Sequence, residues 1–223
     1  MVKLAWAKPY FKDREDAARQ LGGRLSEYKG QNPLVLAVPR GAVPMGKIVA
    51  EALDGELGLA LVHKIGEPGN PEFALGAVSE GGEVYLAPYA RALGHTEESL
   101  APEISRQIEI LKQRRKRYAA AGPLPNADKR IVILLDDGIA TGSTILAAIR
   151  EVRHQGPLKV VVATAAAPPD VVENLRREAD EVAALAVEAD FGAVGEFFEN
   201  FSHVTDEEVV RILKEGRSRP RIA

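Results

Sequence analysis

The stretch that constrains the fold most spans residues 131–144 and has the sequence IVILLDDGIATGST. Five apolar residues end in two adjacent aspartates, and a loop of small and hydroxyl-bearing residues leads into a helical pattern at Ser143. A short, fully apolar run is typical of a strand in a parallel sheet that helices cover on both faces. Ligands of open α/β sheets bind beyond the carboxyl ends of such strands. The stretch therefore predicts an α/β fold with a binding site in residues 136–144.

The rest of the chain repeats the alternation of strands and helices. The predicted strands are residues 33–38, 57–65, 131–135, 158–166 and 182–187, with a hairpin pair at 74–79 and 84–87. The first predicted helix begins after Asp13. The others cover residues 43–53, 96–120, 143–154, 169–179 and 205–214. This alternation implies βα units and a mostly parallel sheet. Because 223 residues suit one domain, we expect a single domain over 1–223 with a helical excursion at about 88–126.

The composition excludes several kinds of chemistry. The chain has no cysteine, which removes disulfides, thiolate zinc sites and cysteine nucleophiles, and its four histidines have no metal-ligand spacing. The net charge of −3 argues against nucleic acid or an anionic membrane as a partner. No apolar run approaches the roughly 20 residues that span a bilayer, and no signal peptide is apparent, so we expect a cytoplasmic protein. Few Asn and Gln residues fit a heat-adapted protein.

The residues after the central apolar run suit a sugar phosphate. Two adjacent carboxylates can accept hydrogen bonds from vicinal sugar hydroxyls. The backbone N–H groups and hydroxyls of residues 140–144 can wrap a phosphate, and the helix that follows adds its positive end. A plain Asp-Asp-Gly turn at the end of a strand would account for the acids but not for the TGST that follows. The segment therefore predicts a ribose 5-phosphate site.

The same segment resembles the signature of type I phosphoribosyltransferases, in which an apolar strand and two acids precede a T-G-x-T phosphate loop. The resemblance implies their three-layer parallel-sheet fold with a small hood, here at about residues 188–204. It implies that Asp136 and Asp137 hold the ribose 2′- and 3′-hydroxyls with Mg²⁺ nearby. The implied 5′-phosphate ligands are Ala140, Thr141, Gly142, Ser143 and Thr144. The implied reaction uses 5-phosphoribosyl 1-pyrophosphate (PRPP), whose pyrophosphate is displaced by a nitrogenous acceptor such as a purine or related base.

A second stretch, VLAVPRGAVPMGKI at residues 35–48, supports two hypotheses about its loop. GAVPMGK is one residue short of the ATP-binding GxxxxGK[ST] loop, but Ile48 stands where Ser or Thr must bind magnesium, and Pro44 stiffens the middle. The resemblance instead implies that Arg40 and Gly41 bind pyrophosphate, with a non-proline cis peptide expected within residues 38–41. Taken alone, Arg40 and Gly41 would be an ordinary turn between a strand and a helix.

Three further groups have both a functional and a structural interpretation. Lys64, within the segment HKIG, either meets pyrophosphate or faces solvent; that segment and NPEFALGA resemble a poorly characterised bacterial branch of the family. In the hood, the resemblance implies that Phe191 stacks on the acceptor base and that Val194 offers a backbone contact. The other hood phenylalanines, expected in the core, are Phe197, Phe198 and Phe201.

The basic run KQRRKR at residues 112–117 is expected on a solvated helix face, although it could instead close over pyrophosphate or touch RNA. The resemblance also leaves a second function open. Some proteins of this fold regulate rather than catalyse, so a non-catalytic sensor of PRPP or nucleotides is the alternative to a transferase. Family analogy implies a homo-oligomer.

Overall fold

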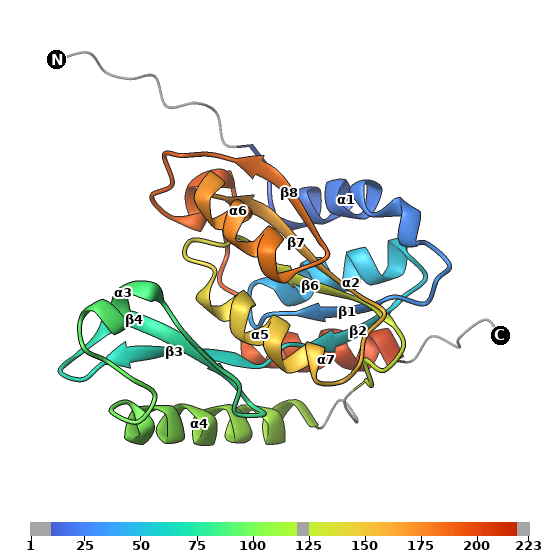
Figure 1. Cartoon of the computed structure of the whole chain (residues 1–223). Helices are drawn as coiled ribbons and strands as arrows, with labels where there is room; N and C mark the ends of the chain where they lie inside the picture. Colours follow the sequence, from blue (N-terminus) through green and yellow to red (C-terminus); the bar gives the residue numbers. More distant parts are fainter. Residues whose placement is uncertain (1–9, 120–124, 218–223) are drawn as a thin grey trace, which may run out of the picture.

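A five-stranded parallel sheet forms the centre of the protein, whose computed structural model describes residues 10–119 and 125–217 (Figure 1). Its strand order is β2-β1-β6-β7-β8. The strands are β1 (Leu34–Ala37), β2 (Glu56–Leu59), β6 (Ile131–Asp136), β7 (Lys159–Ala167) and β8 (Glu181–Val187). All the pairings within this sheet are parallel, which confirms the predicted α/β class.

Helices cover both faces of this sheet and make two separate cores. One face carries α1 (Arg14–Arg24), α2 (Ala42–Ala52) and α7 (Asp206–Arg217). The other carries α5 (Ser143–Arg153) and α6 (Pro169–Glu178). Successive residues of a strand point to opposite faces, so Val35 and Ala37 of β1 enter the first core and Leu34 and Leu36 the second. This explains why β1 is apolar at every position and β6 at every position before Asp136, and it gives the predicted three layers.

The prediction of one strand at residues 57–65 is wrong. The chain leaves the parallel sheet after β2 and enters a separate antiparallel sheet, β3-β4-β5. Its strands are β3 (Val62–Glu67), β4 (Asn70–Ser79) and β5 (Val84–Leu86). Ala60 and Leu61 lie between the two sheets, and the Leu61 carbonyl accepts from the Glu80 N–H at 3.0 Å. An apolar run is compatible with a strand in either sheet, so the sequence does not show where the first strand ends and the second begins. Only the strands with which each half pairs show this.

The antiparallel sheet lies between α5 on one side and α4 (Ala101–Ala119) on the other (Figure 1). The predicted helix at 96–120 begins five residues late, because Thr96 and Ser99 make reciprocal backbone–side-chain hydrogen bonds in a turn of their own. The predicted end at residue 120 lies outside the described residues. A short helix, α3 (Pro88–Ala92), was not predicted. None of the helices in the described ranges is long and apolar enough to cross a membrane.

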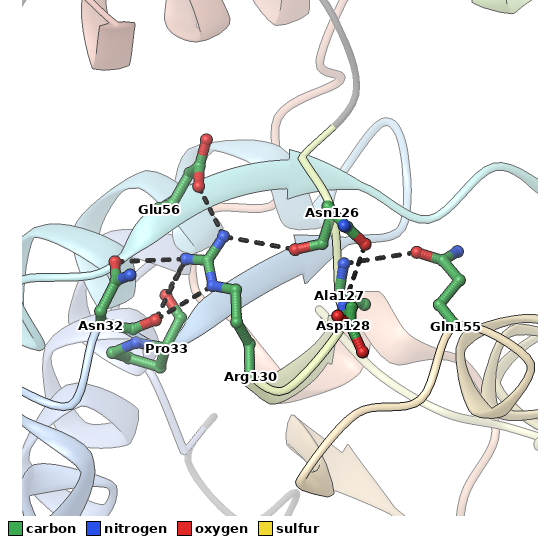
Figure 2. Close-up of polar contacts among 8 residues, drawn as sticks. All are labelled: Asn32, Pro33, Glu56, Asn126, Ala127, Asp128, Arg130 and Gln155. Atoms are coloured by element: carbon green, nitrogen blue, oxygen red, sulfur yellow. Dashed lines mark hydrogen bonds and ion pairs between the residues drawn. The ribbon is translucent and has the colours of Figure 1, made fainter.

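Arg130 joins the amino-terminal ends of three neighbouring strands, opposite the predicted binding edge (Figure 2). It stands just before β6 and donates to the Glu56 carboxylate on β2 at 2.6 Å. It also donates to the Asn32 carbonyl, before β1, at 3.0 and 3.2 Å. Bonds from one charged group to several acceptors hold the edge of the sheet together.

We expect Arg130→Met to lower the free energy of unfolding by about 1–3 kcal/mol, because the hydrogen bonds to Glu56 and Asn32 are lost from a mostly buried guanidinium. Urea unfolding of the purified protein measures the change. Arg177→Met is the matched control, since Arg177 is exposed and its ion pair with Glu173 is 4.0 Å long. Equal stability of the two variants would contradict the structural role of Arg130.

Candidate functional site

The loops after β1 and β6 lie side by side at the carboxyl edge of the parallel sheet. The two strands are adjacent, with Ala37 opposite Leu135, and the Val38 N–H donates to the Leu135 carbonyl at 2.9 Å. The two stretches that the sequence singled out, residues 38–41 and 136–144, therefore meet at one place. A parallel sheet puts the carboxyl ends of its strands on a common edge, which is where such folds bind ligands.

Asp136 is the last residue of β6 and is half-buried. Its Oδ1 accepts a hydrogen bond from the Asp137 N–H at 2.9 Å. Burial raises the pKa of the Asp136 carboxyl well above its ordinary value, and the neighbouring Asp137 charge raises it further. The charge of Lys64 acts in the opposite direction on the same pKa. The carboxylate is therefore costly to ionise alone and is suited to a cationic or hydroxyl-bearing partner.

Asp137 is held by Arg14, the first residue of α1. Arg14 Nε donates to Asp137 Oδ2 at 2.8 Å, and its Nη2 lies 2.8 Å from the same oxygen. The carboxylate also packs against the loop after β1, because a Cβ placed on Gly41 would overlap Asp137 Oδ2. Arg14 carried no signal in the sequence beyond its place at a helix start. Sequence reasoning therefore missed the side chain that holds one of the two predicted acids.

Residues 140–142 form a loop that leads into α5, whose first two residues are Ser143 and Thr144; Ala140 and Thr141 are exposed, whereas Gly142 and Ser143 are buried. Gly142 has a φ of 77° and precedes the first helical residue, Ser143. Glycine adopts this left-handed conformation without the penalty that a side chain brings. In the part of the chain that the structure describes, no hydrogen bond occupies the N–H groups of Ala140, Thr141 or Gly142. Together with the first turn of α5, these donors make an arrangement that can bind an anion.

Arg40 and Gly41 lie in the loop after β1, and the Pro39–Arg40 peptide bond is cis, within the interval where the resemblance places one. The Arg40 guanidinium points to the carboxy-terminal part of the chain. Its Nη2 is 3.0 Å from His203 Nε2, and its Nη1 is 4.0 Å from Asp206 Oδ1. The Arg40 side chain is 41% exposed, so these contacts leave part of the guanidinium accessible to solvent.

Lys64 lies on β3 of the antiparallel sheet, not at the end of a core strand as predicted. Its side chain is exposed, yet it is close enough to Asp136 for its charge to lower the pKa of that carboxyl. The lysine whose charge acts on Asp136 therefore comes from the antiparallel sheet, although we expected it on a strand of the central sheet.

The hood follows β8 and contacts the site through Val194, because a Cβ on Gly138 would overlap the Val194 side chain. Phe191 is half-buried, with its ring centroid 4.9 Å from that of Phe197. Phe197 and Phe198 are buried, as predicted. The prediction that Phe201 is a core residue is wrong: it is 40% exposed. The Arg14 guanidinium carbon lies 3.7 Å from the centroid of the Phe201 ring.

The basic run on α4 is partly paired. Arg115 donates to both oxygens of Glu80, at 2.7 Å each, and Arg117 pairs with Asp206. Lys112 and Lys116 are exposed and have no ion pair among the residues described. The run is therefore a mixture of structural ion pairs and solvated lysines.

The ATP-loop hypothesis for residues 41–47 is wrong. Helix α2 begins at Ala42, so Gly46 and Lys47 lie inside it. A Cβ on Gly46 would lie 2.9 Å from the side chains of Ala37 and Leu57, which means that this glycine lets the helix approach the sheet. Lys47 Nζ is 2.6 Å from Glu215 Oε2 on α7. Neither residue is placed to hold a nucleotide phosphate.

The fold and this edge define an open α/β-sheet protein whose paired acids and free loop amides follow β6, next to the loop after β1. Comparison with known proteins gives the family: the model of the "phosphoribosyl transferase domain" matches residues 11–196, so the chain belongs to the phosphoribosyl transferase domain family. That match takes in both loops of the site and the first half of the hood.

Individual relatives agree with this assignment. The chain is 39% identical over 211 residues to the Mycobacterium tuberculosis proteins "Putative phosphoribosyl transferase Rv0571c" (strain H37Rv) and "Putative phosphoribosyl transferase MT0597" (strain CDC 1551). The match covers 91% of this chain but 46% of those proteins, so the chain spans about half their length. The crystal structure of TT1426 from Thermus thermophilus is 46% identical, with a TM-score of 0.79, over 92% of this chain and 98% of that one.

Proposed function

We propose that the protein is a phosphoribosyltransferase that binds PRPP at the edge formed by β1 and β6 and transfers phosphoribose to a nitrogenous acceptor. The observation that carries the proposal is the juxtaposition of the Asp136–Asp137 pair with the unoccupied amides of residues 140–142. Acceptors for sugar hydroxyls and donors for a phosphate thus lie a few residues apart. Family membership supports the same ligand.

Each part of PRPP is bound by a different group of site residues. The N–H groups of residues 140–144 hold the 5′-phosphate at the start of α5. Asp136 and Asp137 accept from the ribose hydroxyls. Arg40, the Gly41 backbone and Lys64 hold the pyrophosphate, to which arginine and lysine bring compensating charge. The acceptor binds next to the hood residues Phe191 and Val194, of which Val194 packs against Gly138 beside the acids.

Catalysis by this arrangement relies on charge and position. Departure of pyrophosphate from C1′ leaves positive charge on the sugar, and the two carboxylates place negative charge near it. Holding the sugar, the leaving group and the acceptor in one geometry removes the entropic cost of bringing them together. No side chain of the described site has to form a covalent bond to the sugar.

Magnesium fits the acids as an ion shared with the substrate. Carboxylate oxygens are the ligands Mg²⁺ prefers, but among the described residues no group of three or more His, Cys, Asp or Glu side chains could form a protein cage. Mg²⁺ usually keeps several waters and binds through one or two carboxylates and substrate phosphates. Asp136 and Asp137 would hold it, and the ion would neutralise charge on the pyrophosphate.

The proposal is tested by incubating the protein with Mg²⁺, PRPP and a panel of purines, pyrimidines and related bases while pyrophosphate release is measured. We expect release that depends on one class of base. Saturable PRPP binding without turnover across the panel would favour the sensor hypothesis. Absence of PRPP binding in the calorimeter, with and without Mg²⁺, would refute the proposed ligand.

A further inference from the structure

Arg14 is a buried charged residue beside the predicted acids. It is 9% exposed, and it lies on the inward face of α1 with Ala17, Ala18 and Leu21. Burying a guanidinium is costly unless its N–H groups are bonded. Its surroundings therefore have to supply acceptors. These are the carboxylate of Asp137, one of the two predicted acids, and the carbonyl of Ser202 in the hood.

The guanidinium joins three segments that are far apart in the sequence. Its Nε and Nη2 meet Asp137 Oδ2, each at 2.8 Å. Its Nη1 donates to the Ser202 carbonyl, at the end of the hood, at 2.6 Å. Its face lies over the Phe201 ring, 3.7 Å from the centroid. A rigid planar group with contacts on its edges and its face has one orientation.

Arg14 contacts one of the two carboxylate oxygens of Asp137. Arg14 uses Oδ2 alone, and the same oxygen packs against Gly41 of the loop after β1. Within the described residues, no N–H group donates to Oδ1, and the Asp137 carboxylate also interacts with the side chain of Asp136. Asp137 is therefore held through Oδ2, and no N–H donor occupies Oδ1.

We propose that Arg14 is a positioning residue of the sugar site: it clamps Asp137 Oδ2 between Gly41 and the hood, so that Oδ1 is presented to a ribose hydroxyl. The nature of the ligand rests on the proposed function, whereas the clamp itself rests on the contacts of Arg14. Because the clamp includes Ser202 and Phe201, it also ties the hood to the acid that binds the sugar.

The clamp makes a specific prediction about ligands. Arg14→Met should weaken binding of ribose 5-phosphate about tenfold or more, since a displaced Asp137 loses a charge-assisted hydrogen bond to the ribose. Binding of inorganic phosphate, which needs only the loop amides, should not change. Arg14→Lys keeps the charge but not the planar fork, so it should restore part of the ribose 5-phosphate affinity.

Calorimetry with ribose 5-phosphate and with inorganic phosphate, both with Mg²⁺, measures these effects in Arg14→Met, Arg14→Lys, Asp137→Asn and the Arg14→Met/Asp137→Asn double variant. If Arg14 acts through Asp137, the double variant binds ribose 5-phosphate no more weakly than Asp137→Asn alone. Arg19→Met is the control, because Arg19 lies on the same helix and is exposed. Equal losses for the two ligands, or a loss in the double variant that is the sum of the single losses, would overturn the proposal.

A crystal structure of Arg14→Met tests the clamp without any ligand. We expect the Asp137 carboxylate to turn away from Gly41, and an unchanged carboxylate would overturn the positioning role. If the wild-type protein binds ribose 5-phosphate no better than phosphate, the proposed function fails, and the crystal structure alone decides whether Arg14 positions Asp137. The unfolding temperature of each variant shows that the protein is folded during the measurements.

Discussion

Gly41→Ala should lower the affinity for PRPP about 100-fold while the protein remains folded. A Cβ at this position would overlap Asp137 Oδ2 and would lie 3.1 Å from Arg14 Nη2. Gly41 has an ordinary helical conformation, with φ of −56° and ψ of −37°, so the backbone accepts alanine without strain. The added methyl group therefore acts through space, by pushing Asp137 and Arg14 away from the site. Losing a charge-assisted hydrogen bond between a carboxylate and the sugar costs about 1.5–3 kcal/mol, so the displacement of Asp137 is enough for a loss of this size.

Gly23→Ala is the matched control for this change. Gly23 lies in α1, in the helix that begins with Arg14, and a Cβ there would meet nothing within 4 Å. Alanine should stabilise that helix by roughly 0.5–1 kcal/mol and leave PRPP binding unchanged. Titration calorimetry compares the two variants with the wild type. Wild-type affinity in Gly41→Ala would mean that the loop after β1 and Asp137 do not form one site.

Asp136→Asn should reduce kcat/KM for pyrophosphate release about 100-fold, with most of the loss in kcat. Asparagine keeps the shape of the side chain and an oxygen for the Asp137 N–H, but it removes the negative charge beside the reacting carbon. Removing one electrostatic contact of this kind from an enclosed site commonly costs about 10²–10³ in rate. If the protein proves to be a sensor, the same substitution should weaken PRPP binding.

The control for Asp136→Asn is Asp128→Asn. Asp128 is exposed and precedes the same strand, at the end of the sheet that carries Arg130. Its loss removes the same charge from the protein without touching the predicted site. Steady-state kinetics at saturating Mg²⁺ compare the two. Similar kinetic constants in both variants would remove Asp136 from the mechanism.

The part of the site that could be predicted from the sequence is the segment of residues 131–144, which carries the two acids. The apolar run of β6, the aspartates at its end and the glycine that turns the chain into α5 follow one another within 14 residues, and the structure places them as strand, carboxylates and helix start. The cis peptide was expected within four residues and lies there. Such features depend on residue chemistry over short distances, which a sequence displays directly.

The split of residues 57–65 between two sheets shows where that information ends. The apolar pattern continues through β2 into β3, so neither hydrophobicity nor spacing marks the change of sheet. The antiparallel sheet then carries Lys64 to the acids by a route that the alternation of strands and helices did not suggest. Strand pairing depends on partners elsewhere in the chain, and the local hydrophobic pattern does not show which strands these are.

The class of fold, the two loops at the sheet edge and the two acids could be predicted, because each is encoded by residues that are neighbours in the sequence. The bond between Arg14 and Asp137, 123 positions apart, and the place of Phe201 under the guanidinium instead of in the core appear only in the folded protein. A buried charge takes whichever acceptors the packing of helix, loop and hood brings within hydrogen-bond distance, and a sequence does not display that packing.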